Sequence, residues 1–187
     1  GTGPRNHGMV AEMKPNFFLT VTELGDFSSE KKHGIKVSAY PDLRWKRCDI
    51  KSLNLLPNVL ARLDAEKKGC AEAILVNDKG EITEGSASSF FAVFSREKKI
   101  VTRPLAEDIL PGITREIITQ IAVNAGLTVI EKVLTPFQAT HADELFIAVT
   151  TKDIVPVVEF DGAVIADGKP GGYTKALVRE IGLVVSR

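Results

Sequence analysis

The sequence predicts an α+β fold with a mostly antiparallel sheet, and three observations lead to that prediction. Short runs rich in β-branched and aromatic residues recur along the chain. Several of these runs are joined by tight turns of the kind that link neighbouring antiparallel strands. Segments with apolar residues three and four positions apart lie between the runs and are typical of helices. Strands and helices in this arrangement favour one sheet flanked by helices.

Most of the predicted strands lie in the first half of the chain. A helix is predicted from Pro57 to Gly69, because proline favours a first turn while lysines and glycine favour a helix end. Asn54 is a possible cap for this helix. The segment 28–34 is polar and is predicted to be a turn. The strands are predicted at residues 16–23, 34–40, 71–76, 82–84, 88–94 and 99–102.

The second half of the chain is predicted to hold two longer helices. Residues 115–126 place Ile117, Ile118 and Ile121 on one helical face, and Gly126 is a natural stop. The other long helix is predicted from about residue 172 to the end. Between them we expect a strand at 127–132, a short helix at 136–143, a strand at 144–149 and a hairpin of 155–160 with 163–165.

The composition excludes several classes of protein. The 187 residues are 44% hydrophobic, which is enough for one substantial core. The 24 basic and 24 acidic residues balance, so nothing favours a nucleic-acid partner. No apolar run reaches the roughly 18 residues of a membrane span. Cys48 and Cys70 have no metal or redox spacing, so we expect a reduced, cytoplasmic protein without a metal site.

Lys51 stands in an unusual neighbourhood for a lysine. It follows Ile50 and precedes Leu53, Leu55 and Leu56. Apolar surroundings lower the pKa of an amine, and a neutral amine is a nucleophile that can form a Schiff base. The alternative is that Lys51 extends its ammonium group into solvent.

Two further stretches could contact a ligand. Glu84 ends a strand and is followed by glycine and serines, and its carboxylate could keep an aromatic nitrogen base protonated. In I-L-P-G-I-T-R (109–115) a Pro-Gly turn leads into a helix, so the N–H groups of Ile113 and Thr114 are free to bind a phosphate. The alternatives are an ordinary turn with a solvated Glu84 and a loop without a ligand.

Two more candidates contribute polar groups. Thr150 and Thr151 end a strand and could add hydroxyl donors to the same phosphate, although threonine is also common in strands. Arg5 and His7 in the opening loop could hold a carboxylate, although such loop residues are usually solvated.

These stretches, in this order and spacing, resemble the fold-type IV enzymes that depend on pyridoxal 5'-phosphate (PLP). That family includes D-amino acid aminotransferases, branched-chain aminotransferases and aminodeoxychorismate lyases, and the similarity is greatest to the first group. It covers essentially the whole chain. The matching pieces are R-N-H at 5–7, L-R-W-K-R-C-D-I-K-S-L-N-L-L at 43–56, T-E-G-S at 83–86 and G-I-T-R at 112–115.

The resemblance implies a role for each matching residue. Lys51 would form the Schiff base with PLP and move a proton between the substrate Cα and the cofactor. Glu84 would pair with the pyridinium nitrogen, and Leu110 would pack against the ring. Arg5 and His7 would bind the substrate carboxylate across a homodimer interface. The phosphate contacts would come from Arg44, Ile113, Thr114 and Thr150.

The resemblance also implies a domain organisation and a reaction. Residues 1–26 would be the tail of a small N-terminal domain with the interdomain linker, most of that domain being absent. Residues 27–187 would be the larger PLP-binding domain, with a barrel-like sheet and flanking helices. The reaction would be transamination between a D-amino acid, such as D-alanine, and a 2-oxo acid. The alternatives are an aminodeoxychorismate lyase, a branched-chain aminotransferase, or a truncated chain without catalytic activity.

Overall fold

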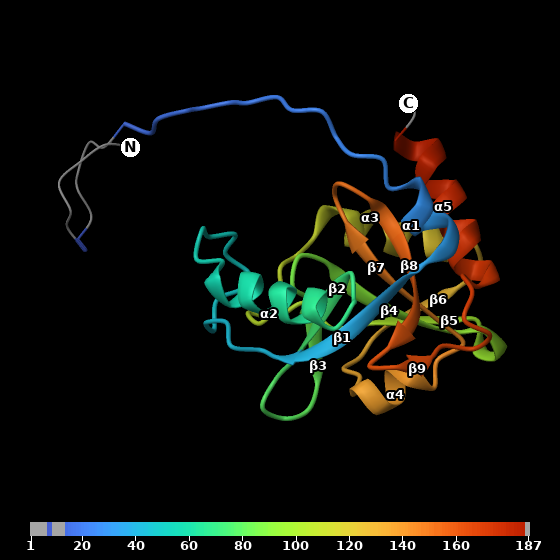
Figure 1. Ribbon diagram of the computed structural model, residues 1–187. Helices are drawn as coiled ribbons and strands as arrows, with labels where there is room; N and C mark the ends of the chain where they lie inside the picture. Colours follow the sequence, from blue (N-terminus) through green and yellow to red (C-terminus); the bar gives the residue numbers. More distant parts are fainter. Residues whose placement is uncertain (1–6, 9–13, 186–187) are drawn as a thin grey trace.

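The structure is a computed structural model that describes residues 7–8 and 14–185. Within these residues nine strands form one sheet, in the order β3-β2-β1-β8-β7-β4-β5-β6, with β9 paired to β8 (Figure 1). The strands are β1 (Ile35–Pro41), β2 (Glu72–Val76), β3 (Ile82–Gly85), β4 (Ser89–Phe94), β5 (Lys99–Thr102), β6 (Thr128–Glu131), β7 (Glu144–Val149), β8 (Asp153–Phe160) and β9 (Ala163–Val164).

The sheet is mixed, with more antiparallel than parallel pairs, which confirms the predicted fold class. The antiparallel pairs are β2–β3, β4–β5, β4–β7, β7–β8 and β8–β9. The parallel pairs are β1–β2, β1–β8 and β5–β6. The hairpins predicted around residues 77–80, 95–98 and 161–162 are all present.

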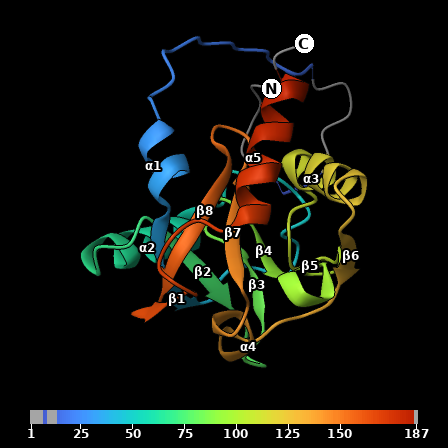
Figure 2. The ribbon, with the colours of Figure 1, turned by 90° about the vertical axis from the view of Figure 1, so that its right-hand side faces the viewer.

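Helices flank both faces of the curled sheet (Figure 2). They are α1 (Ser28–His33), α2 (Leu56–Lys67), α3 (Ile113–Asn124), α4 (Pro136–Thr140) and α5 (Gly172–Val185), with a short 3₁₀ turn η1 (Ser95–Glu97). The helices α3 and α5 cover one face, where Ile118 and Leu177 are fully buried beside the stacked rings of Phe91 and Phe146. Among the described residues, no helix is long and apolar enough to cross a membrane.

The strand β4 shows how the sequence builds two cores from one sheet. Phe90 and Ala92 face one apolar cluster, and Phe91 and Val93 face the other. This alternation follows from the period of two along a strand. All four side chains are at most 5% exposed, so β4 lies at the centre of the fold.

Three local predictions are wrong. Residues 16–23 form no strand and are exposed, because β-propensity needs a neighbouring strand, and none in the described chain pairs with them. Residues 28–33 form helix α1 rather than a turn, with the Asp26 carboxylate accepting from the Ser28 backbone N–H at 2.8 Å. Asn54 does not cap α2, since the capping position is Leu55 and no side chain bonds there.

The sheet register brings several element ends to one edge. Ser89 at the start of β4 lies opposite Ala148 near the end of β7, and Gly85 at the end of β3 lies opposite Ile74. The chain after β1 is tied toward this region where the Cys48 N–H donates to the Glu107 carbonyl at 2.7 Å. These connections bring loops from distant parts of the chain together.

Candidate functional site

A pocket of about 720 Å³ lies where these loops meet. It is lined by the loop after β1, helix α2, the turn between β3 and β4, the start of α3 and the turn between β7 and β8. The residues predicted from the sequence that line it are Arg44, Lys51, Glu84, Leu110, Thr114, Thr150 and Thr151. The structure therefore brings together seven residues that are up to about a hundred positions apart in the chain.

The remaining predicted residues do not line the pocket in the described structure. The Ile113 side chain is 73% exposed, although its neighbours Gly112 and Thr114 are lining residues. His7 is exposed and is not a lining residue. Arg5 lies outside the described residues.

Glu84 is the buried carboxylate of the pocket. Its side chain is 8% exposed. Arg44 donates to it from Nη1, and the backbone N–H of Leu110 donates to both carboxylate oxygens at 3.2 Å. Leu110 is thus held against Glu84 by its backbone, while its side chain contributes to the lining.

Arg44 joins two carboxylates. Its Nε and Nη2 donate to Asp42 at 2.9 and 2.8 Å, while its Nη1 donates to Glu84. Nη2 also donates to the Asp108 carbonyl at 3.0 Å. Each of the three guanidinium nitrogens therefore has a protein acceptor. To contact a phosphate, Arg44 would have to share or exchange one of these partners.

Burial and charge set the pKa values of this group. Burial raises the pKa of Glu84 to about 7, against the opposing effect of Arg44, and the nearby Asp42 adds to the rise. Burial also acts to raise the pKa of Asp42, but the hydrogen bonds and charge of Arg44 hold it below its usual value. The pKa of Arg44 is raised, because both carboxylates outweigh its own burial. A cation entering the pocket would favour the charged form of Glu84.

Lys51 lies on the loop between β1 and α2 and lines the pocket. Although its neighbours in sequence are apolar, Lys51 is exposed, in agreement with the alternative that its ammonium group extends into solvent. Those neighbours are exposed as well, Leu53 by 96% and Leu56 by 66%, because they lie on the same surface loop or at the start of α2. No carboxylate in the described residues forms an ion pair with Lys51, so its amine is available to a ligand.

The start of α3 offers unpaired donors. The helix begins at Ile113 after Gly112, and no side chain caps it. A Cβ on Gly112 would lie 3.2 Å from the Ser89 hydroxyl, so glycine suits this close approach. The first-turn N–H groups of a helix attract anions through their partial positive charge. Thr150 in the turn after β7 is exposed and lies across the same pocket.

Asp42 was not among the predicted site residues. The local signal is its position two residues before Arg44, since its carboxylate accepts from the Arg44 backbone N–H at 3.1 Å. Aspartate commonly makes such a turn with the residue two positions ahead. Thr83 completes the group by donating its hydroxyl to Asp42 at 2.7 Å.

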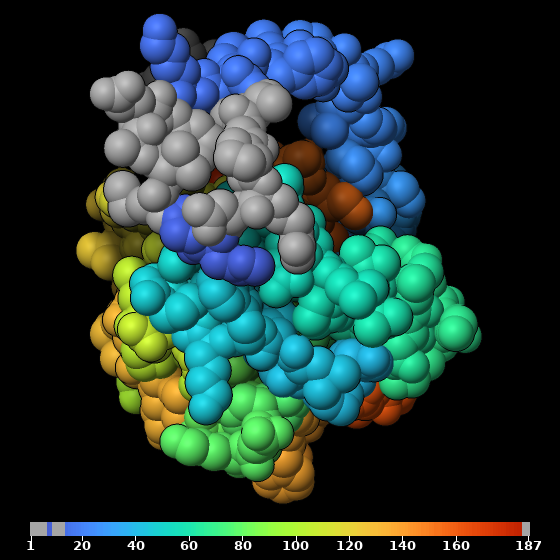
Figure 3. Space-filling model, turned by 90° about the vertical axis from the view of Figure 1, so that its left-hand side faces the viewer, coloured from blue at the N-terminus to red at the C-terminus, as the bar shows by residue number. Residues whose placement is uncertain are grey.

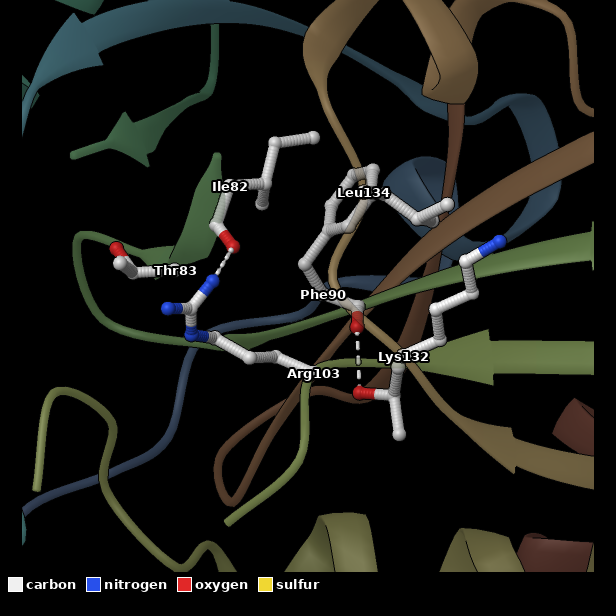
Figure 4. Close-up of a pocket in the computed structure, with 7 residues that line it drawn as sticks. Ile82, Thr83, Phe90, Arg103, Lys132 and Leu134 are labelled. Atoms are coloured by element: carbon white, nitrogen blue, oxygen red, sulfur yellow. Dashed lines mark hydrogen bonds between the residues drawn. The ribbon is translucent and has the colours of Figure 1, made fainter. Parts of the chain in front are cut away.

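A second, smaller pocket can be excluded as the ligand site. It holds about 10 Å³, roughly the volume of one water-sized probe. Figure 4 shows Arg103 there, donating to the Ile82 carbonyl at 2.9 Å, while Phe90 and Leu134 close the other side. Arg103 also pairs with Asp108 at 2.6 Å, so it fixes the loop that leads to Leu110.

Two proteins with sequences similar to this chain are both D-alanine aminotransferases. A D-alanine aminotransferase of Bacillus licheniformis is 38% identical over 175 residues, which cover 94% of this chain and 61% of that protein. One of Staphylococcus haemolyticus is 37% identical over 179 residues, covering 95% of this chain and 62% of that protein. This chain therefore spans about three fifths of the length of these relatives.

Solved structures show the same fold. The branched-chain amino acid aminotransferase of Thermobaculum terrenum, in its PLP form, superimposes with a TM-score of 0.77 and 28% identity, over 83% of this chain and 52% of that one. The branched-chain aminotransferase of Thermoproteus uzoniensis, with norvaline, superimposes with a TM-score of 0.76 and 29% identity, over 88% of this chain and 55% of that one.

The family profile described as amino-transferase class IV matches residues 1–160. That range contains all of the predicted site residues. Enzymes of this class depend on PLP, and they share the curled sheet with flanking helices described above. The chain belongs to the class IV aminotransferase family.

Proposed function

We propose that this chain is the larger, cofactor-binding part of a PLP-dependent aminotransferase that exchanges an amino group between a D-amino acid, such as D-alanine, and a 2-oxo acid. The observation that supports it most is the meeting of Lys51, Glu84 and the uncapped start of α3 around one pocket. The D-alanine aminotransferases at 37–38% identity support the substrate class.

The residues of the pocket fit PLP in both charge and size. A pocket of about 720 Å³ is within the range of cofactor sites. A ring nitrogen that carries a proton matches Glu84, whose pKa of about 7 lets it ionise when a cation binds. The phosphate matches the free first-turn N–H groups of Ile113 and Thr114 and the hydroxyl of Thr150. Leu110 would lie against the ring.

The cofactor, when bound, supplies the electron-withdrawing ring that stabilises negative charge on the substrate Cα. The chain supplies positioning and proton transfer. The Nζ of Lys51 would bond to the cofactor and then take and return the proton at Cα. Glu84 would hold the proton on the ring nitrogen. Arg44 would keep Glu84 in place, and it is also our candidate for a phosphate contact.

The domain organisation and the surroundings of the substrate are part of this proposal. Residues 27–187 would form the larger domain, and residues 1–26 the tail of a smaller one together with the linker. Arg5 and His7 would bind the substrate carboxylate in a homodimer. The exposed apolar side chains Phe17, Phe18 and Val21, each at least 87% exposed, support a packing partner for this segment. We also propose a cytoplasmic location.

A second candidate is branched-chain amino acid transamination, which the structural neighbours support at TM-scores of 0.76–0.77. The two candidates differ in the amino donor. D-alanine would be consumed in the first case and L-leucine in the second. A lyase of the same family would release p-aminobenzoate and pyruvate from aminodeoxychorismate, and product analysis separates it from both.

The test is the visible absorption spectrum of the purified chain with added PLP. We expect a red-shifted band, which borohydride reduction and peptide mapping should assign to a cofactor fixed on Lys51. D-alanine should then bleach the band faster than L-leucine does. The Lys51→Ala variant is the control and should give no covalent label. Absence of both band and label in the wild-type chain would overturn the proposal and favour a truncated, non-catalytic chain.

A further inference from the structure

The turn between β3 and β4 forms one wall of the pocket. Gly85, Ser86, Ala87 and Ser88 all line it, and they directly follow Glu84. Ala87 is exposed to the pocket side, while both serines are at most 7% exposed. Only Gly85 separates Glu84 from Ser86, so the position of this turn constrains the backbone at Glu84.

Glu72, at the start of β2, lies buried behind this turn. It is 3% exposed. One carboxylate oxygen accepts from the Ser86 hydroxyl and from the Ala73 backbone N–H at 2.8 Å. The other accepts from the Ser88 hydroxyl at 3.2 Å. No cation in the described residues pairs with Glu72, so these three hydrogen bonds offset the cost of burying its carboxyl group.

The hydroxyl protons of both serines are therefore committed to Glu72. A hydroxyl carries a single donor, so neither serine can donate to a ligand while this arrangement persists. The turn offers the pocket its shape and backbone rather than hydroxyl donors. In a Gly-Ser-rich stretch beside a pocket, the serine hydroxyls could also donate directly to a ligand. Here they donate to Glu72 instead.

Other contacts fix the same turn. The Asn58 side chain of α2 donates to the Ser86 carbonyl at 2.7 Å. The Ser86 N–H donates to the Ala73 carbonyl at 2.8 Å, and the Gly85 N–H to the Ser88 carbonyl at 2.7 Å. A Cβ at Gly85 would lie 2.1 Å from the Ser88 hydroxyl, so the turn closes tightly only with glycine there.

We propose that Glu72 is a positioning residue for the pocket: by holding Ser86 and Ser88 from behind, it fixes the β3–β4 turn and thereby the carboxylate of Glu84. Its consequence for the cofactor rests on the proposed PLP function, whereas its consequence for the turn does not. The two consequences can be measured separately.

The first measurement is hydrogen–deuterium exchange in the PLP-free chain. Glu72→Gln keeps the size of the side chain but replaces one acceptor with a donor, so the turn should open more often. We expect amides in a peptide covering 84–90 to exchange about tenfold faster, as fits the loss of one buried hydrogen bond. Ser86→Ala should act in the same direction. Because both changes break one contact, their effects in the double variant should not add.

The matched control is Glu144→Gln. Glu144 is also buried, at 7% exposed, and accepts from the backbone N–H groups of Tyr173 and Thr174 at the start of α5, away from the pocket lining. It should speed exchange near residues 172–176 and leave 84–90 unchanged. Unchanged exchange at 84–90 in Glu72→Gln, or an equal rise in Glu144→Gln, would overturn the proposal.

The second measurement is PLP affinity by absorbance titration. We expect the Kd of Glu72→Gln to rise about fivefold or more, and that of Glu144→Gln to stay within about twofold. Equal Kd values in both variants and the wild-type chain would also overturn the proposal. If the wild-type chain takes up no PLP, the proposed function fails, and the exchange result alone decides the role of Glu72.

Discussion

At the scale of single residues, the pocket contains two buried carboxylates that pair with one buried guanidinium. Asp42 and Glu84 share one guanidinium, that of Arg44, and all three side chains are less than 10% exposed. The Arg44 guanidinium donates two hydrogen bonds to the Asp42 carboxylate and one to the Glu84 carboxylate. Burial is the main reason that the pKa of Glu84 is raised to about 7, and the second carboxylate, Asp42, adds to that rise.

The raised pKa of Glu84 predicts a pH dependence of stability. The pKa of Glu84 is about 7 in the folded chain and 4.5 as its ordinary value, so the folded state binds the proton more tightly. The stabilisation is therefore complete below pH 4.5 and is lost as the pH rises through 7. We expect the loss to be roughly 3 kcal/mol of unfolding free energy.

Urea denaturation of the wild-type chain and Glu84→Gln, without PLP, measures this effect. The free-energy difference, wild type minus variant, should be largest near pH 4 and should fall toward pH 8. A difference that grows with pH would contradict the prediction and would mean that the ion pair with Arg44 outweighs burial.

Most of the site residues predicted from the sequence line the pocket, but their contacts could not be predicted. Lys51, Glu84 and Thr114 meet as expected, because each lies beside a recognisable strand or helix end. The partners of Arg44 could not be predicted, since spacing along the chain does not reveal which acceptor a long side chain reaches. The exposure of Lys51 agrees with the alternative left open from its sequence, in which the ammonium group extends into solvent. Apolar neighbours in sequence enclose a residue only when the fold packs them.

At the scale of elements, helix α1 has a clear structural role that composition did not indicate. It contacts strand β8, and through Lys152 also the turn before that strand, which carries the pocket residue Thr150. Two ion pairs join them, Glu30 with Lys152 at 2.7 Å and Lys31 with Asp153 at 2.8 Å. The polar composition of its six residues predicted a turn. In the structure, Glu30 and Lys31 each pair with a residue 122 positions away in the sequence.

This connection predicts a measurable coupling between Glu30 and Lys152. The pair is partly buried, with side-chain exposures of 32% and 19%, and Lys152 also lies 4.4 Å from the ring centre of Phe27. In a double-mutant cycle with alanine, we expect a coupling energy of about 0.5–1 kcal/mol. It should weaken in 1 M salt, where the screening length is about 3 Å.

Arg62 and Glu66 provide the comparison. They form an exposed pair one helical turn apart on α2, at 3.0 Å. Their coupling should be about 0.3–0.5 kcal/mol. If the Glu30–Lys152 coupling is no larger than that pair's, or does not respond to salt, α1 is not held by these charges.

At the scale of the whole molecule, the pocket opens onto a surface with many exposed apolar side chains. Figure 3 shows the face on which the loop after β1 and helix α2 lie, in cyan and teal. The exposed apolar side chains of this region include Trp45, Ile50, Leu53, Leu55, Leu56, Val59, Leu60 and Leu63. Contiguous apolar surface of this kind typically marks an interface. It supports the proposed smaller domain and homodimer as neighbours of the pocket.

The extended segment before α1, residues 14–26, is exposed as well (Figure 1). Its residues have the composition of a strand, yet within the described chain they pair with no strand of the sheet. Composition favours an extended backbone there, but a strand forms only with a partner. The error in predicting 16–23 therefore concerns what surrounds the segment rather than the segment itself.

The final prediction links the pocket to the stability of the whole chain. A ligand that binds only the folded state adds RT ln(1 + [L]/Kd) to its stability, about 2.7 kcal/mol at a hundred times the Kd. For a chain of this size we expect PLP at that concentration to raise the Tm by roughly 5–10 °C. Lys51→Ala should remove most of this rise.

Because Lys51 is exposed and unpaired in the described structure, its replacement should change the PLP-free stability by less than about 0.5 kcal/mol. Differential scanning fluorimetry with pyridoxine as the control ligand, which lacks both aldehyde and phosphate, measures both quantities. Equal stabilisation of the wild-type and Lys51→Ala chains would mean that the amine contributes little to binding and that the phosphate site at α3 dominates.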